Sequence, residues 1–322
     1  MIGKVPPSLL EELIFDRTGA SDERVIQGPA YGEDTAAIRV EDGILVINAD
    51  PISLAVGRIG TLAIHIAAND VAASGAQPAW LTSVMFLPDQ SEQMLTSIIE
   101  QMDETARSVG ISIIGGHSEY APHLQHPLLV LTCLGMTDRY VPTGGARPGD
   151  RLIMTKSAGI EATAILSTDF AEQIETVVPR STLEGASEFY DRVSVIAEAT
   201  LLAGIASAMH DPTEGGLVNG LIELAVASNV SIEVDRGSIP VAKETKWLCD
   251  AVGINPFNTF GSGALLATIP EDAIDKARRR LTEHGIQHEV IGYVADEAGG
   301  AVSLDGEVYT APIRDEMYAL WE

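Results

Sequence analysis

The hydrophobic positions along the chain follow two spacings, one helical and one typical of strands. Met94, Leu95, Ile98, Ile99 and Met102 recur every three or four residues, which predicts an amphipathic helix over 91–109, ended by Gly110. Similar patterns predict further helices at 8–17, 58–74, 161–167, 184–204, 216–228, 243–252 and 272–284. Runs of apolar and β-branched residues predict strands at 35–40, 44–50, 80–87, 111–114, 128–136, 151–155, 231–234, 263–269 and 289–294.

The order of these elements indicates the fold class. Helices and strands mix in both halves without strict βαβ alternation, which favours two α+β domains over one doubly wound sheet. A length of 322 residues also suits two domains. Pro142, Gly144, Gly145, Pro148 and Gly149 form a turn-rich linker. We therefore expect an N-terminal domain over 1–146 and a C-terminal domain over 147–322.

Charge and composition narrow the classes of partner. The net charge of −26 argues against nucleic acid and anionic membranes, which need a basic surface. The uncharged stretches 71–88 and 120–137 are broken by Gly, Pro, Gln or His, so no membrane span is expected. Cys133 and Cys249 lie far apart and form no CxxC motif, which argues against a structural zinc site and suits a reducing compartment. We expect a cytoplasmic protein.

Acidic residues stand next to glycines or inside apolar segments in the first half. Asp34 follows a glycine-containing turn, Asp50 ends an apolar strand, and Asp70 lies in an alanine-rich helix. A carboxylate in an apolar setting is costly unless it is paired or bound to a cation. If these three converged with a glycine-rich loop, they would form a site for Mg²⁺ and phosphate. Taken singly, each is more often a turn residue, a strand-end cap or a buried acid bonded to the backbone.

Five short motifs occur in an order that is typical of one protein family. They are GEDTAA (32–37), NDVAASGAQP (69–78), GGHSE (115–119), GDRLIMTKSAGIE (149–161) and DPTEGGL (211–217). Walker, Rossmann, GxSxG and HExxH signatures are absent from the sequence. The ordered motifs resemble the AIR synthase-related superfamily, which includes aminoimidazole ribonucleotide synthetase, selenophosphate synthetase, thiamine-monophosphate kinase and HypE. The last motif resembles HypE-like members most.

The resemblance implies both a fold and a chemistry. The fold would be a two-domain AIR synthase-like α+β fold, with an N-terminal sheet that forms a β-barrel across a homodimer and a C-terminal α/β sandwich. ATP and Mg²⁺ would bind in the cleft between the domains. The implied metal ligands are Asp34, Asp50 and Asp70. The implied nucleotide contacts are Gly32, Glu33, Asn69, Gly115, Gly116 and Lys156.

The resemblance also suggests catalytic residues. His117 would lie in the loop near the nucleotide, although a lone histidine is more often structural. Asp211 and Glu214 stand three residues apart just before a helix, where both could act as acid or base near the acceptor. The alternative is a helix-capping turn, for which Thr213 is the better candidate, while the role of Asp211 stays open.

Two functions remain as alternatives. The first is an ATP-dependent enzyme that phosphorylates a carbonyl- or amide-type oxygen of a small-molecule or protein-borne acceptor. The second is a nucleotide-binding regulatory or maturation partner without turnover. It is motivated by two departures from HypE-like sequences: no cysteine stands near Tyr318–Glu322, and no glycine-rich loop precedes Gly32. Only Gly3 and Lys4 are available there. Lys4 could substitute for the loop, but we expect it to be a solvated terminal lysine.

Overall fold

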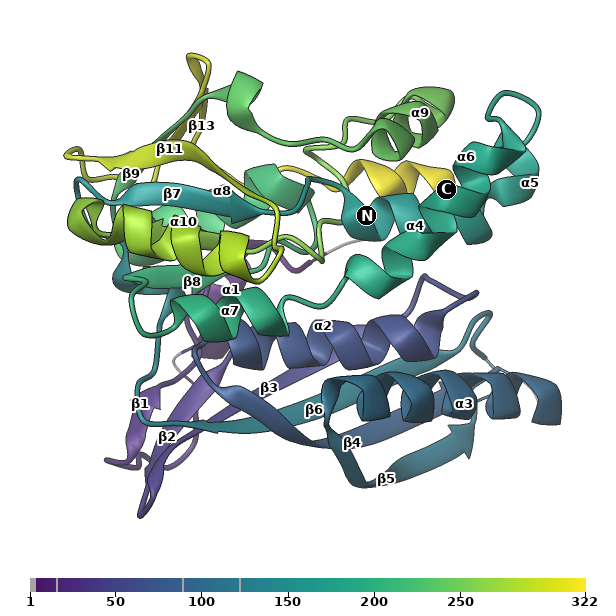
Figure 1. Ribbon diagram of the computed structural model, residues 1–322. Helices are drawn as coiled ribbons and strands as arrows, with labels where there is room; N and C mark the ends of the chain where they lie inside the picture. Colours follow the sequence, from purple (N-terminus) through teal and green to yellow (C-terminus); the bar gives the residue numbers. More distant parts are fainter. Residues whose placement is uncertain (1–3, 16, 89, 122) are drawn as a thin grey trace.

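Apolar side chains alternate with more exposed ones along the strands of the N-terminal half, so that one face of the sheet they form packs against helices. The computed structural model describes residues 4–15, 17–88, 90–121 and 123–322, and Figure 1 shows two sheets with helices around them. The first sheet has the strand order β1-β2-β3-β6-β4-β5, and its pairs are antiparallel except for β4 with β5. Its strands are β1 (Val25–Gln27), β2 (Ala36–Val40), β3 (Gly43–Ile52), β4 (Gln77–Leu87), β5 (Ser112–Tyr120) and β6 (Leu128–Thr137).

Helices α2 (Ile59–Ala73) and α3 (Glu92–Val109) cover one face of this sheet. Helix α3 is amphipathic, as predicted: Ile98 and Met102 are buried, Ser91 caps its start, and Gly110 ends it in the left-handed conformation. Helix α2 is buried along its whole length. It is enclosed because α3 and the sheet lie on one side and the second half of the chain lies on the other.

The opposite face of the first sheet is not covered by the described part of the chain. Most residues on this face are apolar but only half-buried: Leu45, Ile47, Val84, Phe86, Val130 and Leu134. The paired Thr82 and Thr132 lie among them. Trp80, which pairs with Leu134 across β4 and β6, is 42% exposed. The edge strand β5 is exposed throughout. Within one chain this sheet stays open.

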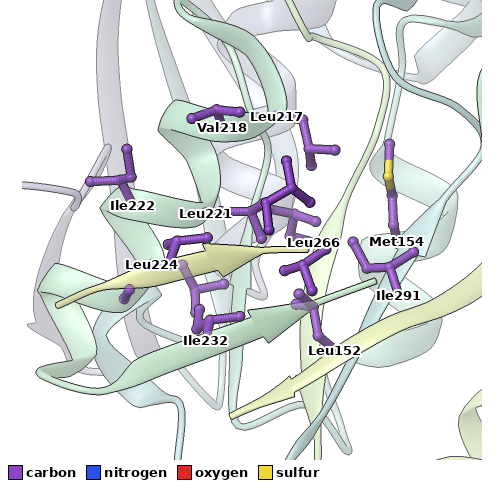
Figure 2. Close-up of a cluster of buried hydrophobic side chains, with 14 of the residues drawn as sticks. Leu152, Met154, Leu217, Val218, Leu221, Ile222, Leu224, Ile232, Leu266 and Ile291 are labelled. Carbon is purple, nitrogen blue, oxygen red and sulfur yellow. The ribbon is translucent and has the colours of Figure 1, made fainter. Parts of the chain in front are cut away.

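The second sheet is the centre of the C-terminal half. Its order is β13-β12-β9-β11-β7-β10-β8. Helix α8 (Gly216–Ser228) packs on one face, where Figure 2 shows Leu217 and Leu221 against side chains of the strands. Helices α7 (Ile196–Leu202) and α10 (Ile274–Glu283) pack with Ile153 and Leu265 on the other face. The strands are β7 (Arg151–Thr155), β8 (Ala208–His210), β9 (Ser231–Val234), β10 (Leu266–Ile269), β11 (His288–Ala295), β12 (Val302–Leu304) and β13 (Glu307–Tyr309).

A further group of helices joins the two halves. It packs on Leu62 and Ile66 of α2, and Met317 near the end of the chain lies within the group. Its members are α4 (Ile160–Thr168), α5 (Ala171–Ile174), α6 (Arg180–Ser187), η3 (Glu188–Arg192), α9 (Lys243–Val252) and η6 (Glu316–Leu320). Short elements elsewhere are α1 (Pro7–Leu10), η1 (Glu11–Phe15), η2 (Thr143–Gly145), η4 (Arg236–Ser238) and η5 (Glu271–Ala273).

The single helix predicted over 184–204 is wrong. The segment forms α6, η3 and α7, and the helix stops between Arg192 and Ile196. Side chains from elsewhere bind the backbone at this break. Asn69 of α2 donates to the Val193 carbonyl at 2.9 Å and accepts from the Val195 amide at 2.8 Å. Lys156 donates to the carbonyls of Arg192 and Ser194.

Other predicted bounds also change. The helix expected over 8–17 is a short helix followed by a π-helical turn that ends at Phe15, and residue 16 lies outside the described residues. The strand expected over 111–114 continues to Tyr120. Strands β1, β8, β12 and β13 are short and escaped prediction. Among the described residues, no helix is long and apolar enough to cross a membrane.

Candidate phosphoryl-transfer site

Three carboxylates converge where the two halves of the chain meet. Asp34 lies in the loop before β2, Asp70 in α2, and Asp211 directly after β8. One oxygen of each lies within 4.8 Å of the others, so the three could share one cation. Asp70 and Asp211 are buried, whereas Asp34 is open to solvent. Asp34 and Asp70 were expected as metal ligands and Asp211 as an acid or base, and the structure groups all three.

The cluster carries more negative charge than its surroundings neutralise. Neither side-chain oxygen of Asp211 has a hydrogen-bond partner among the described residues. Burial and then Asp34 raise the pKa of Asp211 well above its usual range, while burial and then Asp50 do the same for the pKa of Asp70. Crowded buried carboxylates are costly unless protons or a cation neutralise them. This all-oxygen donor set fits a hard divalent cation such as Mg²⁺.

Asp50 adjoins the cluster through Asp70. The two carboxyl groups hydrogen-bond, and burial raises the pKa of Asp50. Asn48 lies two residues earlier, on the same face of β3. It donates to Asp70 at 2.7 Å and accepts from the Cys133 amide at 3.2 Å. Asn48 therefore fixes the orientation of Asp70.

A chain of charged groups leads from Asp34 into the C-terminal half. His210 is buried, and its Nδ1 lies 3.1 Å from Asp34 while its Nε2 lies 3.0 Å from Glu223 of α8. Desolvation lowers the pKa of His210, but Asp34 and Glu223 outweigh it and raise that pKa well above its ordinary value. Burial would raise the pKa of Glu223, yet Lys4 and His210 lower it to about 2. This row of charged side chains therefore holds Asp34 toward the other carboxylates.

Lys4 is exposed, as the sequence predicted, but it is also paired with acids of the C-terminal half. Its ammonium lies 3.3 Å from Glu223, and its backbone amide donates to Glu214 at 2.8 Å. Desolvation lowers the pKa of Lys4, but Glu223, Asp34 and Glu214 together raise it above its usual range. The side chain is half-exposed, so its charge can still reach a ligand.

Two cavities flank Lys4. The larger, of about 570 Å³, extends from Asp50 to Glu161, Phe260 and Tyr318. The smaller, of about 410 Å³, is lined by Asp34, Glu223 and the segment around Leu10 and Phe15. The smaller cavity therefore borders the carboxylate cluster at Asp34, and the larger one reaches Asp50, which adjoins the cluster. A phosphoryl donor and an acceptor need such an arrangement, since they must meet at the metal.

The DPTEGGL motif forms the turn that leads into α8, and its last two residues begin the helix. Glu214 lines both cavities and accepts hydrogen bonds from Lys4 and the Tyr318 hydroxyl. The capping role expected of Thr213 is wrong, because α8 begins after Gly215, whose amide donates to Asp315 at 2.6 Å. No side chain in the described part of the chain caps α8, and the acceptor of the Gly215 amide stands 100 positions away along the chain.

Four of the residues expected to contact nucleotide hold the two halves and their linker together, and their contact with nucleotide stays a prediction. An added Cβ at Gly32 would lie 2.8 Å from the Glu223 carbonyl of α8, so glycine permits this close approach. Glu33 accepts from the Gly144 amide at 2.8 Å and from Tyr140. Asn69 and Lys156 bind the break at 192–195, and Lys156 also pairs with Glu198. Gly32, Glu33 and Asn69 are sequence neighbours of the carboxylates and hold the segments that carry them.

The GGHSE motif lies away from the cluster within one chain. Gly115, Gly116 and His117 belong to the exposed edge strand β5 rather than to a loop. A Cβ at Gly116 would lie 2.0 Å from the Ser83 carbonyl, so glycine is required for the parallel pairing with β4. His117 lies 3.2 Å from Glu119 on the surface. Strands β3, β6 and β4 separate β5 from β2, at the start of which Asp34 lies.

Sequence reasoning missed Asn48, His210 and Glu223. Asn48 could have been found, because it alternates with Asp50 on one face of a predicted strand. His210 directly precedes the DPTEGGL motif and could have been included with it. Glu223 carried no local signal, since it stands in an apolar stretch of a predicted helix. Its partners lie 13 and 219 residues away along the chain.

Comparison with known proteins identifies the family. The models of the AIR synthase related protein N-terminal and C-terminal domains match residues 32–137 and 147–305. The chain is 27% identical to a hydrogenase expression/formation protein of Methanocaldococcus jannaschii, over 93% of this chain and 90% of that protein. It is 29% identical to the carbamoyl dehydratase HypE of Azotobacter vinelandii, over 82% of this chain and 79% of the relative. The crystal structure of hydrogenase maturation protein HypE in complex with ATP matches with a TM-score of 0.72 at 23% identity, covering 95% of this chain and 94% of that one. The chain therefore belongs to the AIR synthase related family.

Proposed function

We propose that this protein binds Mg²⁺–ATP at Asp34, Asp70 and Asp211 and transfers a phosphoryl group to a carbonyl- or amide-type oxygen. The observation that carries the proposal is that neither oxygen of Asp211, beside two further carboxylates, has a hydrogen-bond partner in the part of the chain that the structure describes. Relatives support it: a HypE structure contains ATP, and the HypE of Azotobacter vinelandii is named a carbamoyl dehydratase, so that its substrate carries a carbonyl-type oxygen.

Acidic and basic side chains have different roles in this proposal. Bound Mg²⁺–ATP would supply an electrophilic phosphoryl group and neutralise part of its charge. Asp34, Asp70 and Asp211 would hold the metal, and the hydrogen bond from Asn48 would keep Asp70 oriented for it. Lys4 offers a half-exposed ammonium between the two cavities, where it can attract phosphate as a point charge. Glu214 and Asp50 face the larger cavity and are placed to accept a proton from the acceptor.

The nucleotide belongs on the side of the smaller cavity in this proposal, and the acceptor in the larger one. Asp34 lines the smaller cavity, and Asp50 lines the larger. Apolar side chains such as Leu10 and Phe15 beside Tyr31 give the smaller cavity a surface that suits a flat base. The acceptor would then approach the metal from the opposite side.

Replacing one proposed metal ligand tests whether the carboxylate cluster binds Mg²⁺–ATP or has only a structural role. We expect Mg²⁺–ATP to raise the melting temperature of the wild-type protein, since a ligand at a hundredfold excess over Kd adds about 2.7 kcal/mol. Asp211→Asn should abolish this rise and leave the ligand-free protein equally or slightly more stable, because it removes repulsion among buried acids. Differential scanning fluorimetry and calorimetry with ATP measure both effects.

The control is Asp103→Asn, an exposed residue of α3 that pairs with Arg107. It should keep the full response to Mg²⁺–ATP. Equal responses of wild type and Asp211→Asn would contradict the proposed metal site. If nucleotide binds but no phosphoryl transfer to small amides or to partner proteins is detected above background, the nucleotide-binding partner without turnover becomes the better description.

We further propose a homodimer that covers the open face of the first sheet. The half-buried apolar residues of β3, β4 and β6 form a continuous surface ending at the exposed strand β5. Monomeric proteins rarely expose a surface of this kind, and unpaired edge strands are usually covered. A twofold axis beside β5 would pair two such sheets and extend them toward a barrel.

A further inference from the structure

A further cavity lies at the end of β7, apart from the carboxylate cluster. It has a volume of about 700 Å³ and is lined by residues that follow β7, that lead into α9 and that connect α10 to β11, together with Arg192. Among the described residues it shares no lining residue with the two cavities that flank Lys4. A ligand in this cavity would therefore occupy a site separate from the proposed phosphoryl-transfer site.

The balance of charge in this lining is the reverse of that in the whole protein. The chain has 46 acidic residues against 20 Lys and Arg residues. The described lining has three basic side chains, Lys156, Arg192 and Lys243, against the two acids Glu244 and Glu289. An anion is repelled by most of the surface of such an acidic protein, but much less at a locally basic cavity. The cavity therefore favours an anionic ligand.

Arg192 is the base of this lining whose charge is not neutralised by an ion pair. Lys156 pairs with Glu198 at 2.8 Å, and Lys243 lies 3.6 Å from Glu244. In the part of the chain that the structure describes, no acid lies within ion-pair distance of Arg192, although Glu244 is near enough to raise its pKa. Burial acts more strongly and lowers the pKa of Arg192. A half-buried guanidinium of this kind gains from an anionic partner.

The guanidinium of Arg192 is also held in place. Its central carbon lies 4.4 Å from the centre of the Phe189 ring, one turn earlier in η3. A guanidinium that rests on an aromatic ring keeps its N–H groups free to donate at its edges. Its planar fork matches two oxygens of a phosphate or carboxylate group. Arg192 is therefore prepared to bind an oxyanion with two hydrogen bonds.

Ser157 adds a hydroxyl without a partner to the same lining. It is 4% exposed, and its Oγ forms no hydrogen bond with any of the described residues. A buried hydroxyl without a partner costs free energy, which a ligand that accepts its hydrogen bond would recover. The half-buried side chains of Pro240, Val241 and Ile286 give the cavity apolar surface as well. The lining thus suits a ligand that has both an oxyanion and an organic part.

We infer that this cavity binds a small organic phosphate. Arg192 holds the phosphate group through two of its N–H groups, and the Ser157 hydroxyl donates a further hydrogen bond after a turn about its χ1 angle. The organic part lies against Pro240, Val241 and Ile286. The cavity does not include the proposed metal ligands, so its occupation requires neither Mg²⁺ nor ATP.

Calorimetric titration of the full chain with three probes tests this assignment. Phenyl phosphate, benzoate and benzenesulfonamide share a ring, but their head groups are a tetrahedral dianion, a planar anion and a neutral tetrahedral group. The titration is made at mildly alkaline pH without divalent ions, in about 0.15 M salt, which screens the long-range repulsion of the acidic surface. We expect phenyl phosphate to bind more tightly than benzoate and at least about tenfold more tightly than benzenesulfonamide, because hydrogen bonds to a charged group are the stronger ones.

Variants locate the binding. Arg192→Gln should bring the ratio of the phenyl phosphate and benzenesulfonamide affinities close to one, and Arg192→Lys should restore only part of it, since an ammonium lacks the planar fork. Ser157→Ala should weaken phenyl phosphate about three- to tenfold and leave the melting temperature of the ligand-free protein unchanged or higher, because the lost hydroxyl has no partner in the described chain. The control Arg39→Gln removes an exposed positive charge from β2 and should keep the wild-type ratio.

Equal binding of the three probes, tighter binding of benzoate, or no binding of phenyl phosphate overturns the inference. So does a ratio that falls in Lys4→Gln but not in Arg192→Gln, since the phosphate would then lie beside the carboxylate cluster. Should Arg192→Gln fail to fold, Ser157→Ala still tests the site, because it must weaken phenyl phosphate more than benzenesulfonamide. Wild-type protein that binds phenyl phosphate but not Mg²⁺–ATP would refute the proposed function and leave this phosphate site standing.

Discussion

Asp315 connects the end of the chain to the start of α8 through a buried carboxyl group. It accepts hydrogen bonds from the Gly215 amide at 2.6 Å and the Met317 amide at 2.9 Å, and it is 1% exposed. Burial raises its pKa from 3.8 to about 7, although both hydrogen bonds oppose the shift. The group it holds includes Tyr318, a wall of the larger cavity. The hydrogen bonds of Asp315 therefore hold the segment that carries Tyr318.

The stability of the protein should fall between pH 5 and 8 because of this residue. The folded pKa lies above the unfolded value, so its contribution is complete below about pH 4 and is lost as the pH rises through about 7. The whole shift of about three units corresponds to roughly 4 kcal/mol, of which about two units, or roughly 2.7 kcal/mol, are lost between pH 5 and pH 8. Asp315→Asn keeps an acceptor oxygen without a charge and should flatten this fall.

Urea unfolding at pH 5 and at pH 8 measures the effect. The exposed Asp103→Asn should keep the wild-type difference between the two pH values, because Arg107 holds the pKa of Asp103 below this window. An Asp315→Asn protein with the same difference as wild type would show that Asp315 is not its source.

At the level of elements, the break between η3 and α7 shows what binds the two halves together. Val193 and Val195 present a carbonyl and an amide that no helix satisfies, and Asn69 of α2 binds both. Lys156, itself in the left-handed conformation with φ of 54°, binds the carbonyls on either side of Val193. The irregular backbone persists because side chains from two other elements complete it.

Asn69→Ala should destabilise the protein by about 2–4 kcal/mol, since it leaves two buried backbone groups without partners. Chemical denaturation measures the loss in the free energy of unfolding. Gln93→Ala on the exposed surface of α3 should change it by less than about 0.5 kcal/mol. A loss no larger than that of the control would mean that water replaces Asn69 at the break.

The same elements show how far a sequence alone predicts this structure. Helices such as α3 were predictable because apolar spacing and caps lie within the helix itself. The break at 193–195 was not, because its partner Asn69 stands 124 to 126 residues away. In the site, Asp34 and Asp70 were signalled by their apolar or glycine-rich surroundings. His210 and Glu223 acquire their roles only from tertiary contacts.

On the scale of the whole molecule, the open face of the first sheet is the largest feature that one chain leaves incomplete. Helices cover its other face, and both faces of the second sheet are packed. The chain therefore places its unsatisfied apolar surface on one side only. This asymmetry favours a closed pair over an extended assembly.

Leu134→Lys should convert the proposed dimer into a monomer, because it places a charge at the centre of the uncovered face opposite Trp80. Light scattering at micromolar concentration measures the mass. Ile99→Lys replaces another exposed apolar residue, on α3 at the covered side of the sheet, and should leave the dimer intact. A wild-type protein that scatters as a monomer would contradict the proposal.

The contacts of Gly32, Glu33 and Asn69 have a consequence for how this fold can vary between relatives. Each lies within two residues of a site carboxylate in the chain. Gly32 and Asn69 touch the C-terminal half, and Glu33 binds the linker that leads to it. A chimera that exchanged one half with a relative would separate these residues from their matching surfaces and misplace the acids beside them. We therefore expect the two halves to vary together among relatives, so that a substitution on one side of their boundary is accompanied by a compensating substitution on the other.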